Sequence, residues 1–330
     1  MNTKIPAAIV GLGRIASLLE DDALREKPCT HAGAITTNGD LALVAGADTD
    51  AVRRNLFSEK WNVPVYHDAA LMLNETRPAV LHIATHPDSH LHYCELAAAY
   101  GVSVVVCEKP LADTLHRARK IAALEKSGRL RVITNHERRY AADYREAEAL
   151  LRGETLGPLL GVRAVLYMGI SQRLRDVLWH DGTHLVDAMM FLTGGTPRHG
   201  RRWGSRLAAR TGTAWLGGRI ERAGAEPVPF VIEAGAGRDH LVFELEFSSA
   251  RGRLRIGNGI FEVWESAPSP YAEKFRSLTK IREGFPGPTG YFSNMAADAV
   301  SCVRESALRP RSSARDGLNV IEYLHAAAGN

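Results

Sequence analysis

The chain has 330 residues, of which 45% are hydrophobic and 24% are charged. These values are typical of a soluble globular protein and exclude a disordered, fibrous or repeat architecture. The formal net charge is +4, and the length favours two domains, each with its own core.

The first part of the chain alternates strand-like and helical runs. Ile5–Val10 is a short β-branched run followed by glycines and by residues 15–19, which predicts a strand, a tight turn and a helix. The charged segment 20–30 predicts an excursion before the helical pattern resumes. Alternation of this kind predicts a doubly wound parallel sheet with helices on both faces. The further strands are expected at 41–47, 80–84, 102–107 and 130–134, and the helices at 68–74, 89–100 and 114–127.

Beyond about residue 136 the pattern changes to successive strands. The alternation of apolar and acidic residues in 241–247 indicates half-buried antiparallel strands, so an open sheet with one covered face is expected. The fold class is therefore α/β, with a Rossmann domain at 1–135 and an α+β substrate-binding and oligomerisation domain at 136–330, whose last helix near 315–328 can pack back on the first domain. The expected strands are 159–168, 211–217, 230–233, 240–247, 252–256 and 260–265, with helices at 181–192 and 292–304.

Several kinds of protein are not expected from this sequence. The apolar run before the first glycines is too short for a signal peptide, and no stretch approaches the roughly 18 apolar residues of a membrane span, so we expect a soluble cytoplasmic protein. No nucleic-acid-reading motif accompanies the basic residues. Neither a disulfide framework nor a zinc site is expected, because no C-x-x-C pair occurs among Cys29, Cys94, Cys107 and Cys302.

The glycine turn is the first motif that carries chemistry. The run Gly11-Leu12-Gly13-Arg14-Ile15-Ala16 fits G-x-G-x-x-A, in which the first glycine permits the turn and the second lets a pyrophosphate approach the backbone. A following helix would direct its N-terminus at the phosphates. This arrangement predicts a dinucleotide cofactor.

Asp48 closes the second predicted strand and narrows the choice of cofactor. Its carboxylate can accept hydrogen bonds from the adenosine ribose hydroxyls, which favours NAD over NADP. A 2′-phosphate would be repelled there, although Arg53 and Arg54 could soften that repulsion. The alternative is that Asp48 simply caps a helix.

Glu108-Lys109-Pro110 follows the strand at 102–107, at the carboxyl edge of the sheet where doubly wound folds bind ligands. With the glycine turn, with Thr85-His86-Pro87 and His90, and with the run 182–187 (Gly-Thr-His-Leu-Val-Asp), this motif makes the chain resemble the Gfo/Idh/MocA family of oxidoreductases over nearly its whole length. The resemblance implies NAD(P)-dependent sugar chemistry and a homodimer or homotetramer built on the open sheet.

The resemblance also implies roles for individual residues. Lys109 would hydrogen-bond the reacting hydroxyl, and His184 would be the acid/base group from the second domain. Arg139 and Tyr291 are candidates for contacts to the substrate. The residues expected to contact the cofactor are Gly11, Leu12, Gly13, Arg14, Ile15, Asp48, Thr85, His86, His90, Glu108 and Lys109.

One position departs from the family pattern. Many members carry an aspartate four residues before the acid/base histidine, where this chain has His180, with Asp181 next to it. Either residue could replace the missing carboxylate as a substrate contact or second acid/base group. Although two histidines four residues apart also suggest zinc, no metal is expected, since the H-E-x-x-H pattern is absent.

The sequence predicts the substrate less precisely than it predicts the cofactor. An excess of arginines suits the bidentate binding of a diphosphate, so the favoured substrate is a nucleotide-linked sugar, of the UDP- or dTDP-sugar 3-dehydrogenase or ketoreductase type. The alternatives are a free sugar or inositol, a non-catalytic NAD-binding regulator, and an NAD-dependent glycoside-cleaving enzyme with no net redox change. The arginines are Arg138, Arg139, Arg173, Arg175, Arg198, Arg201, Arg202, Arg206 and Arg210.

Overall fold

The computed structural model describes residues 3–169 and 172–328. The chain divides into two compact units, the first comprising Met1–Ala141 and Pro288–Ile321, the second Ala142–Gly287 and Glu322–Asn330. Within the two described ranges, no helix combines the length and the apolar character that a membrane crossing needs.

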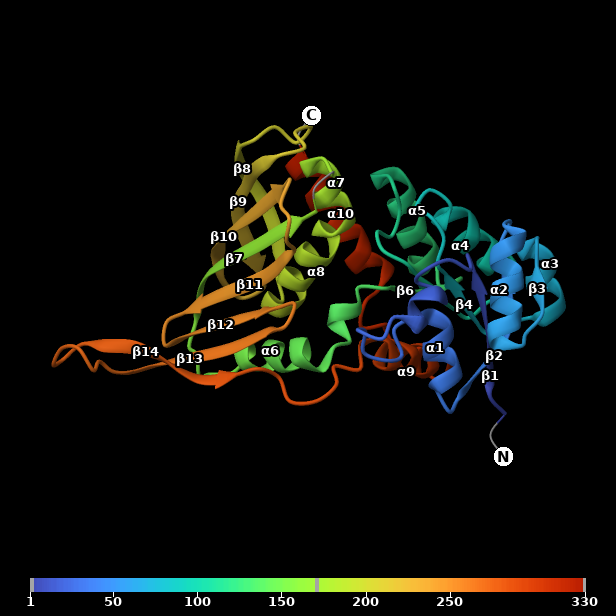
Figure 1. Ribbon diagram of the computed structural model, residues 1–330, viewed down its shortest axis with the longest axis horizontal. Coiled ribbons are helices and arrows are strands. Elements are labelled where there is room, and N and C mark those ends of the chain that lie inside the picture. The colour runs from blue at the N-terminus through green and yellow to red at the C-terminus, as the bar shows by residue number, and fades with distance from the viewer. Residues whose placement is uncertain (1–2, 170–171, 329–330) are drawn as a thin grey trace. The chain divides into compact units, whose positions relative to one another are not determined.

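The first unit is built on a six-stranded parallel sheet in the order β3-β2-β1-β4-β5-β6 (Figure 1). This order is that of dinucleotide-binding Rossmann domains, which confirms the predicted fold class. The strands are β1 (Ile5–Val10), β2 (Leu41–Ala47), β3 (Val65–Tyr66), β4 (Val80–Ile83), β5 (Val104–Cys107) and β6 (Arg131–Thr134). The helices are α1 (His31–Thr37), α2 (Ala51–Trp61), α3 (Ala69–Thr76), α4 (His90–Ala99), α5 (Leu115–Lys126), α9 (Tyr291–Arg304) and α10 (Ala314–Ala328), the last of which continues into the second unit.

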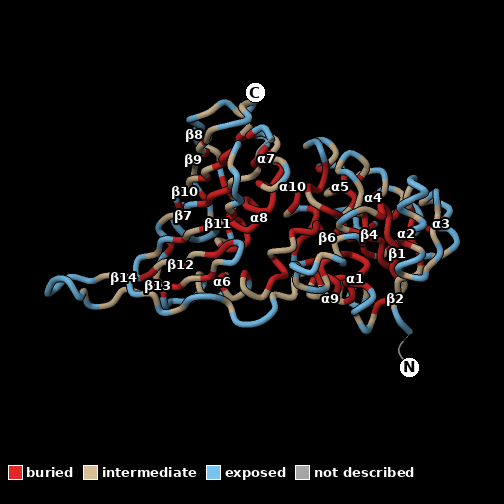
Figure 2. The backbone as a smooth tube through the Cα atoms, in the orientation of Figure 1, coloured by how far each residue is buried: buried red, intermediate tan, exposed pale blue. Residues whose placement is uncertain are grey.

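The strands β4 and β5 show why this sheet forms. Every residue of both strands is buried, as expected for parallel strands that are covered by helices on both faces. Figure 2 shows the buried backbone concentrated in the middle of this sheet. The carboxyl ends of β1, β4 and β5 therefore lie side by side on a rigid support, and the residues that follow them form one edge.

The helix expected directly after the glycine turn is interrupted. Residues 13–17 form one helical turn, in which the Ser17 N–H donates to the Gly13 carbonyl, and a short 3-10 helix, η1, covers Leu18–Asp21. The α-helix α1 begins only at His31, where the N–H donates to the carbonyl of Ile15 (3.1 Å). The predicted helix at 15–19 is thus wrong as a continuous element, whereas the predicted excursion at 20–30 is present between its two parts.

The chain returns to the first unit after residue 287. The helix α9 packs through Phe292, Met295 and Ala299 into the core that also contains Ile9 and Ile35. The sequence pattern predicted this helix in the second domain, because no local signal separates it from the strands that precede it. Only the apolar surface of α1 and β1, which α9 covers, assigns it to the first unit.

The excursion at residues 20–30 also forms hydrogen bonds with the start of α9. The Glu26 carboxylate accepts hydrogen bonds from the N–H groups of Thr289 (2.8 Å) and Gly290 (2.6 Å). A carboxylate is favoured there because the first N–H groups of a helix have no partner within the helix. A segment that interrupts the first helix thus caps a helix from the far end of the chain.

The second unit contains an eight-stranded sheet in the order β14-β13-β12-β11-β7-β10-β9-β8, antiparallel except for the pair β7 and β10. Figure 1 shows helices on one face of this sheet only. The strands are β7 (Leu159–Met168), β8 (Thr196–Gly204), β9 (Gly212–Arg222), β10 (Ala225–Ala236), β11 (Val242–Ser249), β12 (Gly252–Gly257), β13 (Ile260–Pro268) and β14 (Arg276–Glu283). The helices are α6 (Ala142–Arg152), α7 (Leu174–His180) and α8 (Gly182–Thr193).

The alternation predicted for residues 241–247 is confirmed in β11. Phe243, Leu245 and Phe247 are buried on the helix-covered face, and the intervening glutamates lie on the open face. The strand β8 was missed, because most of its residues are polar and exposed. Its pairing with β9 at the edge of the sheet, which no local pattern reveals, makes it a strand.

Replacement of Met295 by alanine tests the packing of α9 on the first unit. Met295 is fully buried, so we expect Met295→Ala to lower the unfolding free energy of this unit by about 2–5 kcal/mol. Hydrogen exchange of the β1 amides in increasing urea measures that free energy. Leu24→Ala is the control, since Leu24 is 97% exposed, and a loss as small as the control's would contradict the packing described.

Candidate active site

The two glycines of the turn have different reasons to be glycine. Gly11 has a φ of +84°, and a Cβ there would lie 2.8 Å from the carbonyl carbon of Ala84. Gly11 is therefore required by the fold itself. At Gly13 φ is not positive, and a Cβ would meet nothing nearer than Arg53 Nη1 at 3.8 Å. Because nothing in the chain requires a glycine at this position, the open space suits a ligand that approaches the backbone.

Asp48 joins the end of β2 to the glycine turn. Its Oδ2 accepts the N–H of Leu12 at 2.8 Å, and its Oδ1 accepts the N–H of Asp50 at 2.9 Å. Arg53 Nη1 lies 3.7 Å from Oδ2, with its side chain 49% exposed. The carboxylate is thus held at the carboxyl edge of the sheet with a half-exposed cation beside it, which suits a ribose diol and places a positive charge close to the turn.

The remaining residues of the turn differ in exposure. Arg14 is exposed and Ile15 is partly buried against the core of the first unit. The carbonyl of Ile15 accepts the N–H of His31, so Ile15 links the turn to α1. Arg14 is the residue of this pair whose side chain remains accessible to a ligand.

The residues after β4 form a hydrogen-bonded loop. Thr85 Oγ1 and Ser89 Oγ are 2.7 Å apart, and the exposed His86 accepts the Ser89 N–H through its carbonyl. His90 is fully buried, with Nε2 3.1 Å from the carbonyl of Thr85 and Nδ1 3.2 Å from that of Leu111. Burial lowers the pKa of His90, although these carbonyls oppose the shift. In this arrangement His90 ties together the loops that follow β4 and β5.

A buried polar cluster lies behind Lys109. One oxygen of Glu108, Oε1, is 2.9 Å from Nε2 of His31 and accepts the Asn135 side-chain N–H at 2.6 Å. The other oxygen, Oε2, accepts the backbone N–H of Lys109 at 3.3 Å. Nδ1 of His31 lies 2.9 Å from Nδ1 of His82. The cluster thus connects α1 with the ends of β5 and β6 and with the middle of β4.

The direction of the hydrogen bonds in this cluster follows from the available donors. The Glu108 carboxylate can only accept, so His31 Nε2 carries a proton. If His31 also donated from Nδ1, His82 would keep its proton on Nε2, which is buried and has no hydrogen-bond partner among the described residues. An orphaned N–H group is costly, so His82 donates to His31 and His31 donates to Glu108.

The charges in the cluster are consistent with this direction. Burial lowers the pKa of His82 well below its usual value, so His82 is neutral. Burial alone would raise the pKa of Glu108, but the hydrogen bonds from His31 and Asn135, together with the charge of Lys109, lower it overall. Glu108 is therefore an anion next to Lys109, which has a half-buried side chain directly after β5.

His31, His82 and Asn135 were not among the residues predicted from the sequence. His82 carried one signal, since a histidine inside the apolar run of β4 must be paired when it is buried. Asn135 follows β6 as Glu108 follows β5, and a shared sheet edge therefore brings the two together. No sequence pattern indicated His31, because it joins the cluster only through the fold: residues 20–30 must first bring the start of α1 back to the glycine turn.

The second unit holds His184 in the first turn of α8. This helix is buried along its whole apolar length, and His184 is 8% exposed. His180 ends α7, and Asp181 separates it from α8, which begins at Gly182, one residue after the start predicted from the sequence. His180 Nδ1 lies 3.1 Å from Asp181 Oδ2, which makes the two candidate replacements for the family aspartate a hydrogen-bonded pair.

Tyr291 and Arg139 lie in the first unit and are bonded to its backbone. The Tyr291 hydroxyl donates to the carbonyl of Glu26 at 3.4 Å, and burial raises its pKa, so this group remains a protonated donor. Arg139 is buried, and its Nη1 donates to the carbonyl of Arg311 at 3.1 Å and lies 3.3 Å from Asp316 Oδ1. These bonds give Arg139 a role in holding the segment before α10.

Known proteins resemble the chain in its first unit most clearly. Residues 5–136 match the Gfo/Idh/MocA oxidoreductase family, described as an oxidoreductase family with an NAD-binding Rossmann fold. The YceM protein of Salmonella typhimurium is 31% identical over 148 residues, which cover 42% of this chain and 44% of that protein. D-apiose dehydrogenase of Paraburkholderia graminis is 26% identical over 313 residues, covering 86% of this chain and 79% of that one.

A similar fold extends over the whole chain. An oxidoreductase from Agrobacterium radiobacter, solved in complex with NAD+, L-tartaric acid and magnesium, superimposes with a TM-score of 0.73 at 16% identity, covering 98% of this chain and 95% of that one. The fold and the glycine turn thus define the first unit as an NAD-binding Rossmann domain, of the kind that this oxidoreductase family contains. The match of residues 5–136 to the Gfo/Idh/MocA family confirms the resemblance that the motifs indicated.

The cofactor predicted from the sequence is NAD, and the residues of this edge fit it. Gly13 leaves room for the pyrophosphate, Asp48 is placed for the ribose, and Lys109 lies at the end of β5 on the same edge. The cofactor of the family confirms this prediction.

The two glycines provide a matched test of the cofactor site. Gly13→Ala should leave the unfolding temperature within about 1 °C and weaken NAD binding by roughly tenfold, because the added methyl group enters the space meant for phosphate. Gly11→Ala should instead lower the unfolding temperature by several degrees, because of its positive φ and its contact with Ala84. Calorimetric NAD titration and thermal unfolding measure both effects. Equal behaviour of the two variants would contradict the distinction.

The neutral state of His82 predicts a pH dependence. A histidine whose pKa is lowered in the folded state takes up a proton more readily when unfolded, so stability is present above about pH 6.5 and is lost as the pH falls below it, by up to about 1.4 kcal/mol per pH unit. His82→Gln, which keeps a donor toward His31, should flatten this decline.

The control for this measurement is His116→Gln, since His116 is exposed on α5. Hydrogen exchange of the β1 amides in urea between pH 5.5 and 7.5 gives the unfolding free energy of this unit. If both variants declined as steeply as the parent protein, His82 would not be the group that binds the proton.

Proposed function

We propose that this protein is an NAD-dependent oxidoreductase that transfers a hydride between the nicotinamide and a secondary hydroxyl or ketone of a sugar. Bound NAD supplies the hydride acceptor or donor. The observation that carries the proposal is the ionised Glu108 in contact with the backbone of Lys109, at the carboxyl edge that also bears Gly13. This edge places a cation where doubly wound folds bind substrates.

Lys109 is assigned the binding of the reacting oxygen. A lysine side chain is cationic at neutral pH. The ammonium group can donate a hydrogen bond to the hydroxyl and stabilise negative charge as it develops on oxygen. Because the cation has no lone pair, a separate group must accept the hydroxyl proton.

His184 is assigned that second task. Histidine titrates near neutral pH and serves as a general base or acid, depending on the direction of the reaction. The His180–Asp181 pair next to it supplies one carboxylate and one imidazole, of which Asp181 is the less exposed. We propose that this pair replaces the aspartate found in many family members as a contact to the substrate.

Two observations bear on the substrate class. The relative named D-apiose dehydrogenase supports a free sugar. A nucleotide-linked sugar, the substrate favoured by the sequence analysis, would need arginines for its diphosphate, and several are already engaged: Arg173 with Asp176, Arg198 with Glu221, and Arg202 with the carbonyls of residues 327 and 328. We therefore give the free sugar or polyol precedence and keep the nucleotide-linked sugar as the second candidate.

A homodimer or homotetramer is also part of the proposal. The open face of the second unit's sheet bears cross-strand ion pairs, such as Arg255 with Glu244 (3.0 Å) and with Glu262 (2.9 Å). No helix among the described residues covers this face. A face of this kind supports assembly with a second copy through charged and polar contacts.

Replacement of Lys109 tests whether this residue binds the reacting oxygen of the substrate. Lys109→Met should lower kcat by at least roughly a hundredfold and leave the Kd for NAD within about threefold, because methionine keeps the length and loses the charge. The matched control is Lys126→Met, at an exposed lysine in the last turn of α5. Absorbance at 340 nm with a panel of aldoses, inositols and nucleotide-linked sugars measures turnover.

The same panel distinguishes the alternatives. Tight NAD binding without turnover of any sugar would favour a non-catalytic regulator. Glycoside cleavage without a net change in absorbance would favour the non-redox reaction. Normal turnover by Lys109→Met would contradict the role assigned to Lys109.

A further inference from the structure

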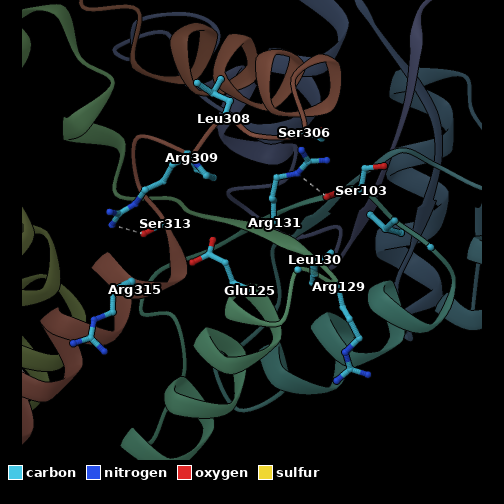
Figure 3. A pocket seen from close by; sticks show the side chains of 14 residues that line it. Ser103, Glu125, Arg129, Leu130, Arg131, Ser306, Leu308, Arg309, Ser313 and Arg315 are labelled. Atoms are coloured by element: carbon cyan, nitrogen blue, oxygen red, sulfur yellow. Dashed lines mark hydrogen bonds between the residues drawn. The ribbon is translucent and has the colours of Figure 1, made fainter.

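One cavity of the first unit lies away from the cofactor edge. It has a volume of about 660 Å³ and is lined only by residues of the first unit (Figure 3). Residues 101–103 lead into β5 and residues 128–131 lead into β6, so the cavity lies at the amino ends of these strands. The glycine turn and Lys109 follow the carboxyl ends of β1 and β5, at the opposite edge of the sheet. The volume is in the range that small-molecule ligands occupy.

The lining carries an excess of positive charge. Arg129, Arg131, Arg309 and Arg315 line the cavity, and Glu125 is the acidic residue among them, which gives a formal charge of +3. Figure 3 shows Arg131 in the middle of the view, Arg309 to its left, and the side chains of Arg129 and Arg315 directed away from Arg131. Four guanidinium groups around one cavity repel one another unless an anion lies between them.

Among the described residues, most of these guanidinium groups have no carboxylate partner. Arg131 donates to the carbonyls of Ser103 and Glu305, both at 3.4 Å, and forms no ion pair with this part of the chain. Arg129 and Arg315 are exposed, and their side chains form neither a hydrogen bond nor an ion pair within residues 3–169 and 172–328. Arg309 Nη2 donates to Ser313 Oγ at 3.2 Å and lies 3.5 Å from Asp316 Oδ2. Each of the four arginines therefore keeps donor groups that no described residue occupies.

Glu125 does not neutralise this charge, because its carboxylate is engaged by the backbone. It accepts the N–H of Val132 at 3.2 Å. Burial raises the pKa of Glu125, and hydrogen bonds from the N–H groups of Val132, Ala314 and Arg315 oppose that rise. The carboxylate thus caps the start of α10 and anchors the wall of the cavity on which Arg309 and Arg315 lie.

From this geometry we propose that the cavity binds a small phosphate-bearing molecule, at a second site separate from the NAD edge. A planar carboxylate accepts from one or two guanidinium groups, whereas a tetrahedral phosphate presents oxygens in several directions and suits arginines that approach from opposite walls. The hydroxyls of Ser103 and Ser306 add donors at the same cavity, and Val102, Leu130 and Leu308 provide an apolar surface for the rest of the molecule.

The probe for this site is inorganic pyrophosphate, titrated calorimetrically into the full chain saturated with NAD+. Saturation occupies the pyrophosphate position at Gly13, so binding there does not contribute. We expect one pyrophosphate per chain, bound more weakly as salt is raised. Arg131→Gln combined with Arg309→Gln should weaken binding at least roughly tenfold. Citrate should bind clearly more weakly than pyrophosphate.

A second pair of variants protects the test against a folding defect. Arg129→Gln combined with Arg315→Gln removes two exposed charges that have no side-chain partner among the described residues, so the unfolding temperature should not change while the Kd rises roughly threefold or more. The matched control is Arg119→Gln on α5, outside the cavity lining, with an expected change of less than twofold.

Three results would overturn the proposal. They are the absence of pyrophosphate binding to the NAD+-saturated chain, equal weakening by Arg119→Gln and the cavity variants, and citrate binding as tight as that of pyrophosphate. None of these results depends on turnover. The phosphate site is therefore tested independently of the proposed oxidoreductase activity.

Discussion

The hydrogen bond between His31 and the buried carboxylate of Glu108 is the interaction on which the edge of the first unit depends. A carboxylate in this position is stable only when donors surround it, and His31, Asn135 and the backbone of Lys109 supply them. His82 completes the set by holding His31 in the tautomer that donates. The next residue after Glu108 is Lys109. The buried Glu108 carboxylate therefore holds the backbone of Lys109 and also places a negative charge beside its side chain.

This interaction explains why the interrupted first helix matters. His31 begins α1 only because residues 17–30 leave the helical path and return to it, with the His31 N–H bonded to the carbonyl of Ile15. The same excursion caps α9 through Glu26. The helix α9 then covers the core next to His31, whose ring contacts Phe292 edge to face. The polar cluster, the excursion and the returning helix therefore depend on one another.

Charge is divided between the two edges of the first unit's sheet. At the carboxyl edge, an anion beside Lys109 balances the cation, and Arg53 stands near the glycine turn. At the amino edge, the guanidinium groups lack such a balance, since Glu125 is engaged by the backbone. Arginines counted along the sequence suggested a single diphosphate site in the second domain. The structure instead pairs several of those arginines with protein groups and places an unbalanced set in the first unit.

The sequence by itself determined the Rossmann sheet, the NAD turn and the resemblance to the family, because these rest on local patterns: apolar runs of strand length, glycines at fixed spacing, and short motifs that follow strands. The tertiary structure alone decided which residues surround Glu108, that α9 belongs to the first unit, and that β8 is a strand. The physical reason is that each of these features depends on partners far along the chain. His31 and Glu108 are 77 positions apart, and no local pattern records the burial that makes them partners.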